Sequence, residues 1–160
     1  MGRFSGVKPS GAGGQFYLPG TYLVRCERMS IVKARKGDDQ FTIESTVLES
    51  SNPEVPVGSR RTAMIPYTDD AMGFIMAAAM AHMQLDASAP VSAEELADIE
   101  AAFETFIAPD DAAKKIKGNA AKGEVVRVEA YHVAKGEGYA TTRSGARYVA
   151  TKFYPAPAAA

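Results

Sequence analysis

Segments within about 22–67 and 125–154 alternate apolar and polar residues with a period of two, and a segment with helical spacing separates them. Strict alternation is typical of strands with one buried face, whereas apolar residues three and four positions apart are typical of amphipathic helices. The order strands, helices, strands therefore limits the fold more than composition does. We expect a mainly β domain of the α+β class with a helical insertion.

Three strands are predicted before the helical segment. In the first, Tyr22, Val24 and Cys26 form one apolar face. The second is expected to pair with it as an antiparallel hairpin. A turn with Pro53, which has no N–H for a ladder, precedes the third strand. The three strands are expected at about 22–32, 41–47 and 59–67.

Two helices are predicted in the middle of the chain. Thr68 or Asp69 is a candidate cap for a helix through residues 72–83. Ser92 and Glu95 have the spacing of a capping box and predict the start of a second helix. Pro109 is expected to end that helix, and a short third piece is expected at 110–117. Strands at 125–131 and 146–154 complete the predicted elements.

This order matches a five-stranded barrel of the oligonucleotide/oligosaccharide-binding (OB) type, with helices between strands three and four. A half-open sheet packed on helices is the structural alternative. The domain prediction is a flexible arm at 1–15, one domain at 16–154 with an acidic insert at 68–118, and a Pro/Ala tail at 155–160.

Charge is unevenly distributed, although the formal net charge is only −1. The balance is +3 over residues 1–65 and +6 over residues 113–160. Residues 66–112 contain no Lys or Arg and have a balance of −10. Such asymmetry indicates a polyanion as partner, while the alternative is that both kinds of surface are merely solvated.

The sequence lacks the usual motifs of enzymes and metal sites. It has one cysteine, two distant histidines, and no Gly-rich phosphate loop, nucleophile elbow or zinc helix. The acidic pairs Asp69–Asp70 and Asp110–Asp111 are interpreted as charges at helix starts. We therefore expect no catalytic residue, no metal, no cofactor and no membrane anchor.

Basic and aromatic residues recur together in the strand segments. Single-stranded nucleic acid needs both kinds of group, because cations follow phosphates and rings stack on unpaired bases at about 1–3 kcal/mol per base. Taken singly, each ring is better explained as a core residue and each cation as a solvent-facing one. Taken as a set, the candidate nucleic-acid-binding residues are Arg28, Lys33, Arg35, Lys36, Arg60, Arg61, Tyr67, Arg127, Tyr131, Arg143, Arg147, Tyr148, Lys152 and Tyr154.

Arg60 and Arg61 form the only pair of adjacent arginines in this set. Neighbouring side chains in a strand point to opposite faces, so the two cannot form one clamp unless a bulge intervenes. At most one of them is expected to line a binding groove.

Two parts of the sequence resemble a known family. They are Tyr17-Leu18-Pro19-Gly20-Thr21-Tyr22 with the following Lys/Arg-Gly-Asp-Asp turn and the stretch VLESSNPEVPVGSR (47–60), and the end Phe153-Tyr154-Pro155. Both are similar to small proteins encoded in the replication regions of tailed phages, over roughly residues 16–67 and 148–155. That family is generally regarded as single-stranded DNA-binding, with an OB-type barrel.

The resemblance implies non-catalytic binding of single-stranded DNA in phage DNA replication or recombination, in the host cell cytoplasm. This function also implies that the chain forms a homo-oligomer and binds a replication or recombination protein. The tail at 155–160 lacks the acidic, Phe-ended peptide of many bacterial single-strand binders. The alternative is an OB-like interaction or structural protein that acts through its acidic insert, without nucleic acid.

Overall fold

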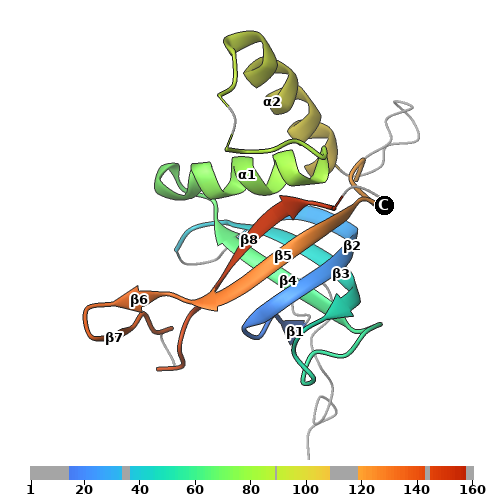
Figure 1. Cartoon of the computed structure of the whole chain (residues 1–160). Helices are drawn as coiled ribbons and strands as arrows, with labels where there is room; N and C mark the ends of the chain where they lie inside the picture. The colour runs from blue at the N-terminus through green and yellow to red at the C-terminus, as the bar shows by residue number, and fades with distance from the viewer. Residues whose placement is uncertain (1–14, 34–36, 89, 109–118, 143–144, 158–160) are drawn as a thin grey trace, which may run out of the picture.

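The computed structural model describes residues 15–33, 37–88, 90–108, 119–142 and 145–157. The described chain is mostly β, with a mixed six-stranded sheet and two helices. Figure 1 shows the sheet curving around an interior, with both helices at the same end of it. The mainly β class with an inserted helical segment is therefore confirmed.

The strands follow the order β1-β4-β3-β2-β5-β8 across the sheet. They are β1 (Gln15–Phe16), β2 (Gly20–Val32), β3 (Gln40–Ser50), β4 (Arg60–Pro66), β5 (Val125–His132) and β8 (Val149–Pro155). All neighbours are antiparallel except β1 and β4, which are parallel. The long strand β2 pairs with both β3 and β5, so it joins the two halves of the sheet.

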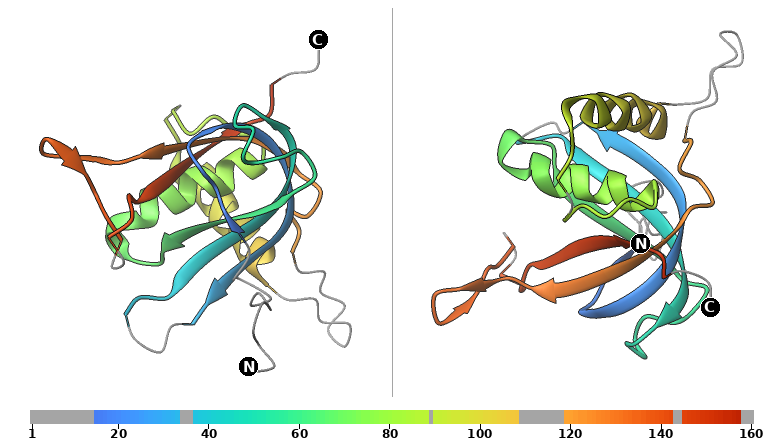
Figure 2. Two further views of the ribbon diagram at one scale, coloured as in Figure 1. Left: turned by 90° about the horizontal axis from the view of Figure 1, so that it is seen from below. Right: turned by 45° about the horizontal axis from the view of Figure 1, so that its top comes forward.

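The predicted strands all form, and the predicted hairpin of the first two is β2–β3. The structure adds the short strand β1 and a small separate hairpin of β6 (Ala134–Lys135) and β7 (Gly138–Tyr139). Figure 2 shows this hairpin projecting from the body. The last strand begins at Val149 rather than at the predicted Ala146, because the preceding segment folds back and the Tyr148 N–H donates to the Ala140 carbonyl at 2.8 Å.

The two helices begin differently. Ser92 caps α2 (Ala93–Ile107) as predicted, and its hydroxyl accepts a bond of 3.1 Å from the Glu95 N–H. Neither Thr68 nor Asp69 caps α1 (Met72–His82), because a 3₁₀ turn, η2 (Asp69–Ala71), precedes the helix and Ala71 occupies its N-cap position. The predicted end at Pro109 and the predicted piece at 110–117 lie outside the described residues.

The core lies between the inward face of the sheet and the helices. Its largest strand residues include Tyr22, Val24, Phe41, Ile43, Val126 and Val128, all fully buried. Helix α1 packs along β8 and buries Ile75 and His82, whereas α2 buries only Ile99 and Phe106 among the residues described in it. The two helices of the predicted acidic insert therefore differ in role. Helix α1 belongs to the core, whereas α2 carries an exposed acidic face.

No helix in the described ranges is long and apolar enough to cross a membrane.

Candidate nucleic-acid interface

The outward face of the β5–β8 pair carries two of the predicted cations and two of the predicted rings. The ladder places Arg127 opposite Tyr154 and Tyr131 opposite Ala150. Lys152 lies between Ala150 and Tyr154 on β8, and strand alternation puts its side chain on the same face of the sheet as that of Tyr154. We call Arg127, Tyr131, Lys152 and Tyr154 the β5–β8 face.

Each cation of the β5–β8 face lies over one of its rings. The guanidinium carbon of Arg127 is 4.9 Å from the centroid of the Tyr154 ring, and Nζ of Lys152 is 5.3 Å from that of Tyr131. Both separations are within the range of cation–π attraction. In the part of the chain that the structure describes, neither cation forms a salt bridge with a carboxylate. Glu129, which lies opposite Lys152 in the ladder, adds one carboxylate to the same face.

The β6–β7 hairpin continues the same kind of pairing beyond the end of β5. The Arg147 guanidinium carbon lies 4.4 Å from the ring centroid of Tyr139, at the end of the hairpin. His132 meets the same ring edge-on, with centroids 5.7 Å apart. A third cation–ring pair thus stands next to the β5–β8 face.

Two hollows lie between β4 and β8, which do not pair with each other in the described sheet. The first has a volume of about 640 Å³ and is lined by β1, β3, β4 and the segment that leads into β8. The second, of about 300 Å³, is lined by the end of β4, the start of α1, β5 and β8. They share the lining residues Met64, Pro66, Tyr148 and Thr151, so we treat them together as the seam hollows.

Tyr148 belongs to the wall of both seam hollows and is 36% exposed. Burial, with a smaller contribution from Tyr131, raises the pKa of its phenol. Tyr131 also lines the second hollow, which connects the hollows to the β5–β8 face. Cations, rings and hollows therefore form one continuous surface.

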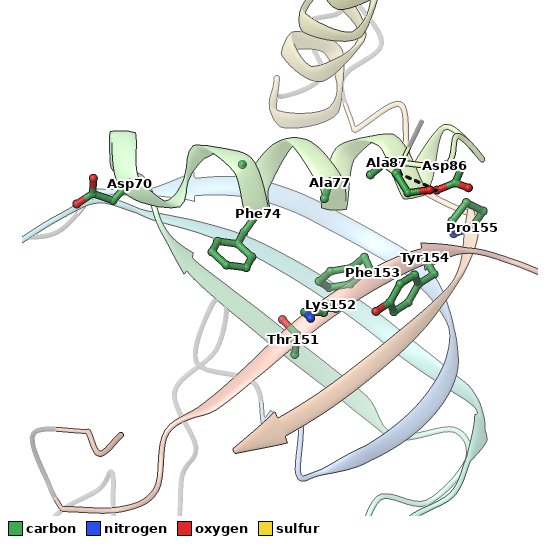
Figure 3. A pocket seen from close by; sticks show the side chains of 12 residues that line it. Asp70, Phe74, Ala77, Asp86, Ala87, Thr151, Lys152, Phe153, Tyr154 and Pro155 are labelled. Atoms are coloured by element: carbon green, nitrogen blue, oxygen red, sulfur yellow. Dashed lines mark hydrogen bonds between the residues drawn. The ribbon is translucent and has the colours of Figure 1, made fainter. Parts of the chain in front are cut away.

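A third hollow, of about 380 Å³, lies between α1 and β8. Figure 3 shows Phe74 pointing from α1 toward β8, with Asp70 and Asp86 at opposite ends of the hollow. Carboxylates at both ends repel phosphate groups. Lys152 and Tyr154 of the β5–β8 face also line this hollow, so it adjoins that face and is the part of the surface least suited to phosphate.

The adjacent arginines occupy different environments. Arg60 is exposed, whereas Arg61 is only 7% exposed. The guanidinium of Arg61 donates to the carbonyls of Phe16 at 3.1 Å and Glu54 at 3.4 Å, and to the Ser59 hydroxyl at 3.3 Å. These bonds tie β1 and the 50–59 turn to β4, so of the two arginines only Arg60 remains available to a ligand.

The remaining candidate binding residues lie apart from the β5–β8 face or outside the residues that the structure describes. Arg28 is exposed on β2, opposite Glu44 in the ladder. Lys33 is bonded to Asp39 at 2.8 Å, and Tyr67 is 37% exposed after β4. Arg35, Lys36 and Arg143 lie outside the described residues.

Sequence reasoning missed Tyr139, Phe16 and Met64, which the structure places at this surface. Tyr139 follows the Gly136–Gly138 turn, where the sequence indicates only a break in a strand. The sequence around Phe16 and Met64 is typical of any strand. These two residues line a seam hollow only because β8 approaches β4 in the folded chain. No local signal in the sequence could have identified them.

Reactive groups elsewhere are few in the described chain. Cys26 is fully buried, and burial raises the pKa of its thiol to about 12, the opposite of what a nucleophile needs. No group of three or more His, Cys, Asp or Glu side chains in the described ranges could hold a metal ion.

Comparison of the chain with protein-family models and with curated protein sequences finds no match.

Proposed function

We propose that this protein binds single-stranded DNA without catalysis and with little sequence preference. The observation that carries the proposal is the continuous surface of cations and rings on the β5–β8 face, which leads into the seam hollows. Cations attract phosphates, and exposed rings stack on bases that have no pairing partner. A single strand of DNA offers both phosphates and unpaired bases, and so it fits this surface.

We further propose that the sheet is an open form of the OB barrel. Without β1, the order β4-β3-β2-β5-β8 corresponds to strands 3-2-1-4-5 in chain order, and the first of these pairs with both the second and the fourth. Helix α1 then falls between strands three and four. OB folds are partly open Greek-key barrels, which agrees with the fact that β4 and β8 do not pair with each other in the described sheet.

The position of the larger seam hollow supports the same proposal. OB folds bind oligonucleotides on the face of strands two and three, next to the loops that follow strands one and four. Here those strands are β3 and β4, which contribute Gln40, Thr62 and Met64 to the hollow. The loop after strand four contributes Arg147 and Tyr148. The hollow thus lies where an OB fold would hold a strand, which supports the proposal.

The proposed setting is phage DNA replication or recombination in the cytoplasm of the host cell. It rests on the resemblance of residues 16–67 and 148–155 to phage replication-region proteins. In that setting, a homo-oligomer and a replication or recombination protein are proposed as further partners.

The test is a fluorescence-anisotropy titration of labelled oligo-dT at two salt concentrations, with a duplex of the same length as control. We expect binding at low salt that weakens steeply as salt rises, because phosphate contacts release counterions. The duplex should bind more weakly, because its bases cannot reach the rings. Absence of oligo-dT binding at low salt would refute the proposal.

A further inference from the structure

Tyr148 stands at the boundary of the two seam hollows. The residues that line both hollows are Met64 and Pro66 on the β4 side and Tyr148 and Thr151 on the β8 side. Tyr148 is the aromatic member of this boundary and is partly exposed. A flat group on either side of this boundary would therefore meet the tyrosine.

The linings of the hollows favour flat, uncharged groups. The second hollow is lined by Met64, Phe74, Val133 and Ala150, besides Tyr131 and Tyr148, and no charged side chain contributes to it. The first has one charged lining residue, Arg147. In the second hollow a phosphate would lose its hydration without gaining a charged partner, whereas a nucleobase would bury an apolar face there.

The cations lie where the backbone of an inserted strand would need them. Arg147 borders the first hollow, and Lys152 lies over the ring of Tyr131, which borders the second. One bound strand could therefore place its bases in the hollows and its phosphates along these cations, with the bases turned toward the protein. The volumes of about 640 and 300 Å³ fall at the scale of small-molecule sites.

We propose that two neighbouring bases of the bound strand leave their mutual stack and enter the seam hollows, one on each side of Tyr148. This inference rests on the proposed single-strand binding and adds the place and manner of base insertion. Tyr148 then acts as a wedge, as apolar side chains do between base steps in other nucleic-acid complexes. Paired bases cannot enter, so the hollows select single strands.

The test compares an oligo-dT of about eight nucleotides, within the site size of OB folds, with a fully abasic strand of equal length and charge. The variants are Tyr148→Ala, Tyr148→Phe and Ala150→Phe, each checked for folding by thermal melting. Ala150→Phe fills the second hollow and leaves every cation in place. We expect the wild-type protein and Tyr148→Phe to prefer oligo-dT by the same factor.

Tyr148→Ala and Ala150→Phe should each reduce that preference about tenfold, because stacking on at least one base is lost. Their salt dependence should stay that of the wild type, since every phosphate-binding cation is retained. A matched variant, Tyr139→Ala, removes an exposed ring that lines neither hollow and should reduce the preference less. Equal losses in Tyr139→Ala and Tyr148→Ala would overturn the inference.

Photocrosslinking provides a readout that does not depend on affinity. Oligo-dT with one 5-iododeoxyuridine should crosslink to the peptide that contains Tyr148, and Ala150→Phe should lower that yield. Normal oligo-dT binding with crosslinks confined to Tyr139 or Tyr154 would reject base insertion and leave the proposed function intact. No oligo-dT binding at all would reject both.

Discussion

Arg60 and Arg61 are neighbours in β4, yet Arg61 is buried and bonded to the carbonyl of Phe16, while Arg60 is exposed. The alternation of side chains in a strand causes this division. A buried guanidinium needs its donors satisfied, and the three acceptors around Arg61 supply that. Two identical residues therefore have different tasks, one in the fold and one at the surface.

Substituting each arginine should separate these tasks. Arg61→Ala should lower the free energy of unfolding by about 2 kcal/mol or more, because hydrogen bonds to a charged group are lost. Arg61→Lys should recover little, since an ammonium lacks the planar fork that reaches several acceptors. Arg60→Ala should change stability by less than about 0.5 kcal/mol. Urea denaturation measures all three, and equal losses in the two alanine variants would contradict the assignment.

Neutralising the cations of the β5–β8 face should weaken DNA binding through its salt dependence. For single strands, the slope of log K against log salt falls by about 0.7 for each phosphate that the protein no longer neutralises. Lys152→Ala should therefore reduce the slope by about 0.7, and the double variant with Arg127→Ala by about 1.4. The control is Lys122→Ala, in an exposed turn before β5. A slope change in Lys122→Ala as large as in Lys152→Ala would argue against this face.

His82 should make the protein less stable in acid. Its ring is buried in α1 beside Phe153, and its Nδ1–H donates to the Ala78 carbonyl at 2.7 Å. Burial lowers the pKa of His82 to about 4, with that hydrogen bond opposing the shift. Between about pH 6.5 and 4 the unfolded state therefore binds a proton that the folded state does not, so stability falls as pH falls.

By about pH 4 this linkage should remove about 3 kcal/mol relative to neutral pH. The measurement is urea denaturation from about pH 7.5 to 4 for the wild type and for His82→Gln, which cannot titrate. Carboxylates contribute equally to both proteins, so the difference between the two curves isolates His82. Parallel curves would show that burial does not shift this histidine.

The acidic face of α2 should be dispensable for DNA binding. Asp98, Glu100 and Glu104 are exposed, and replacing them with Asn and Gln should leave the fold intact. Affinity for oligo-dT should stay the same or rise slightly, as repulsion of phosphates decreases. Glu129→Gln is the matched control, because Glu129 lies opposite Lys152 and its neutralisation should raise affinity more. Loss of DNA binding in the α2 variant would place the strand elsewhere.

Alternation predicted the interface strands well. Val126 and Val128 are fully buried and Arg127 is exposed between them, as the sequence pattern indicates. The same rule puts Arg127 and Tyr131, four residues apart, on one face of β5. Local geometry suffices here, because a strand that buries one face orients all its side chains.

Helical segments were less predictable. Nearly every residue of α1 is apolar, so its pattern does not show which side packs on β8 and which side exposes Phe74. The capping prediction at Thr68 was wrong because a turn of 3₁₀ geometry precedes the helix. Both outcomes depend on how the chain leaves β4.

The sequence by itself determined the strands, the start of α2 and the faces to which Arg127 and Tyr131 belong, because each follows from backbone periodicity or local hydrogen bonding. Only the tertiary structure decided that Arg61 supports the fold and that Met64 and Tyr148 border the same hollows. These relationships join residues far apart in the chain, through the curvature of the sheet and the approach of β8 to β4. Such approaches depend on the packing of the whole core, for which no single segment carries the information.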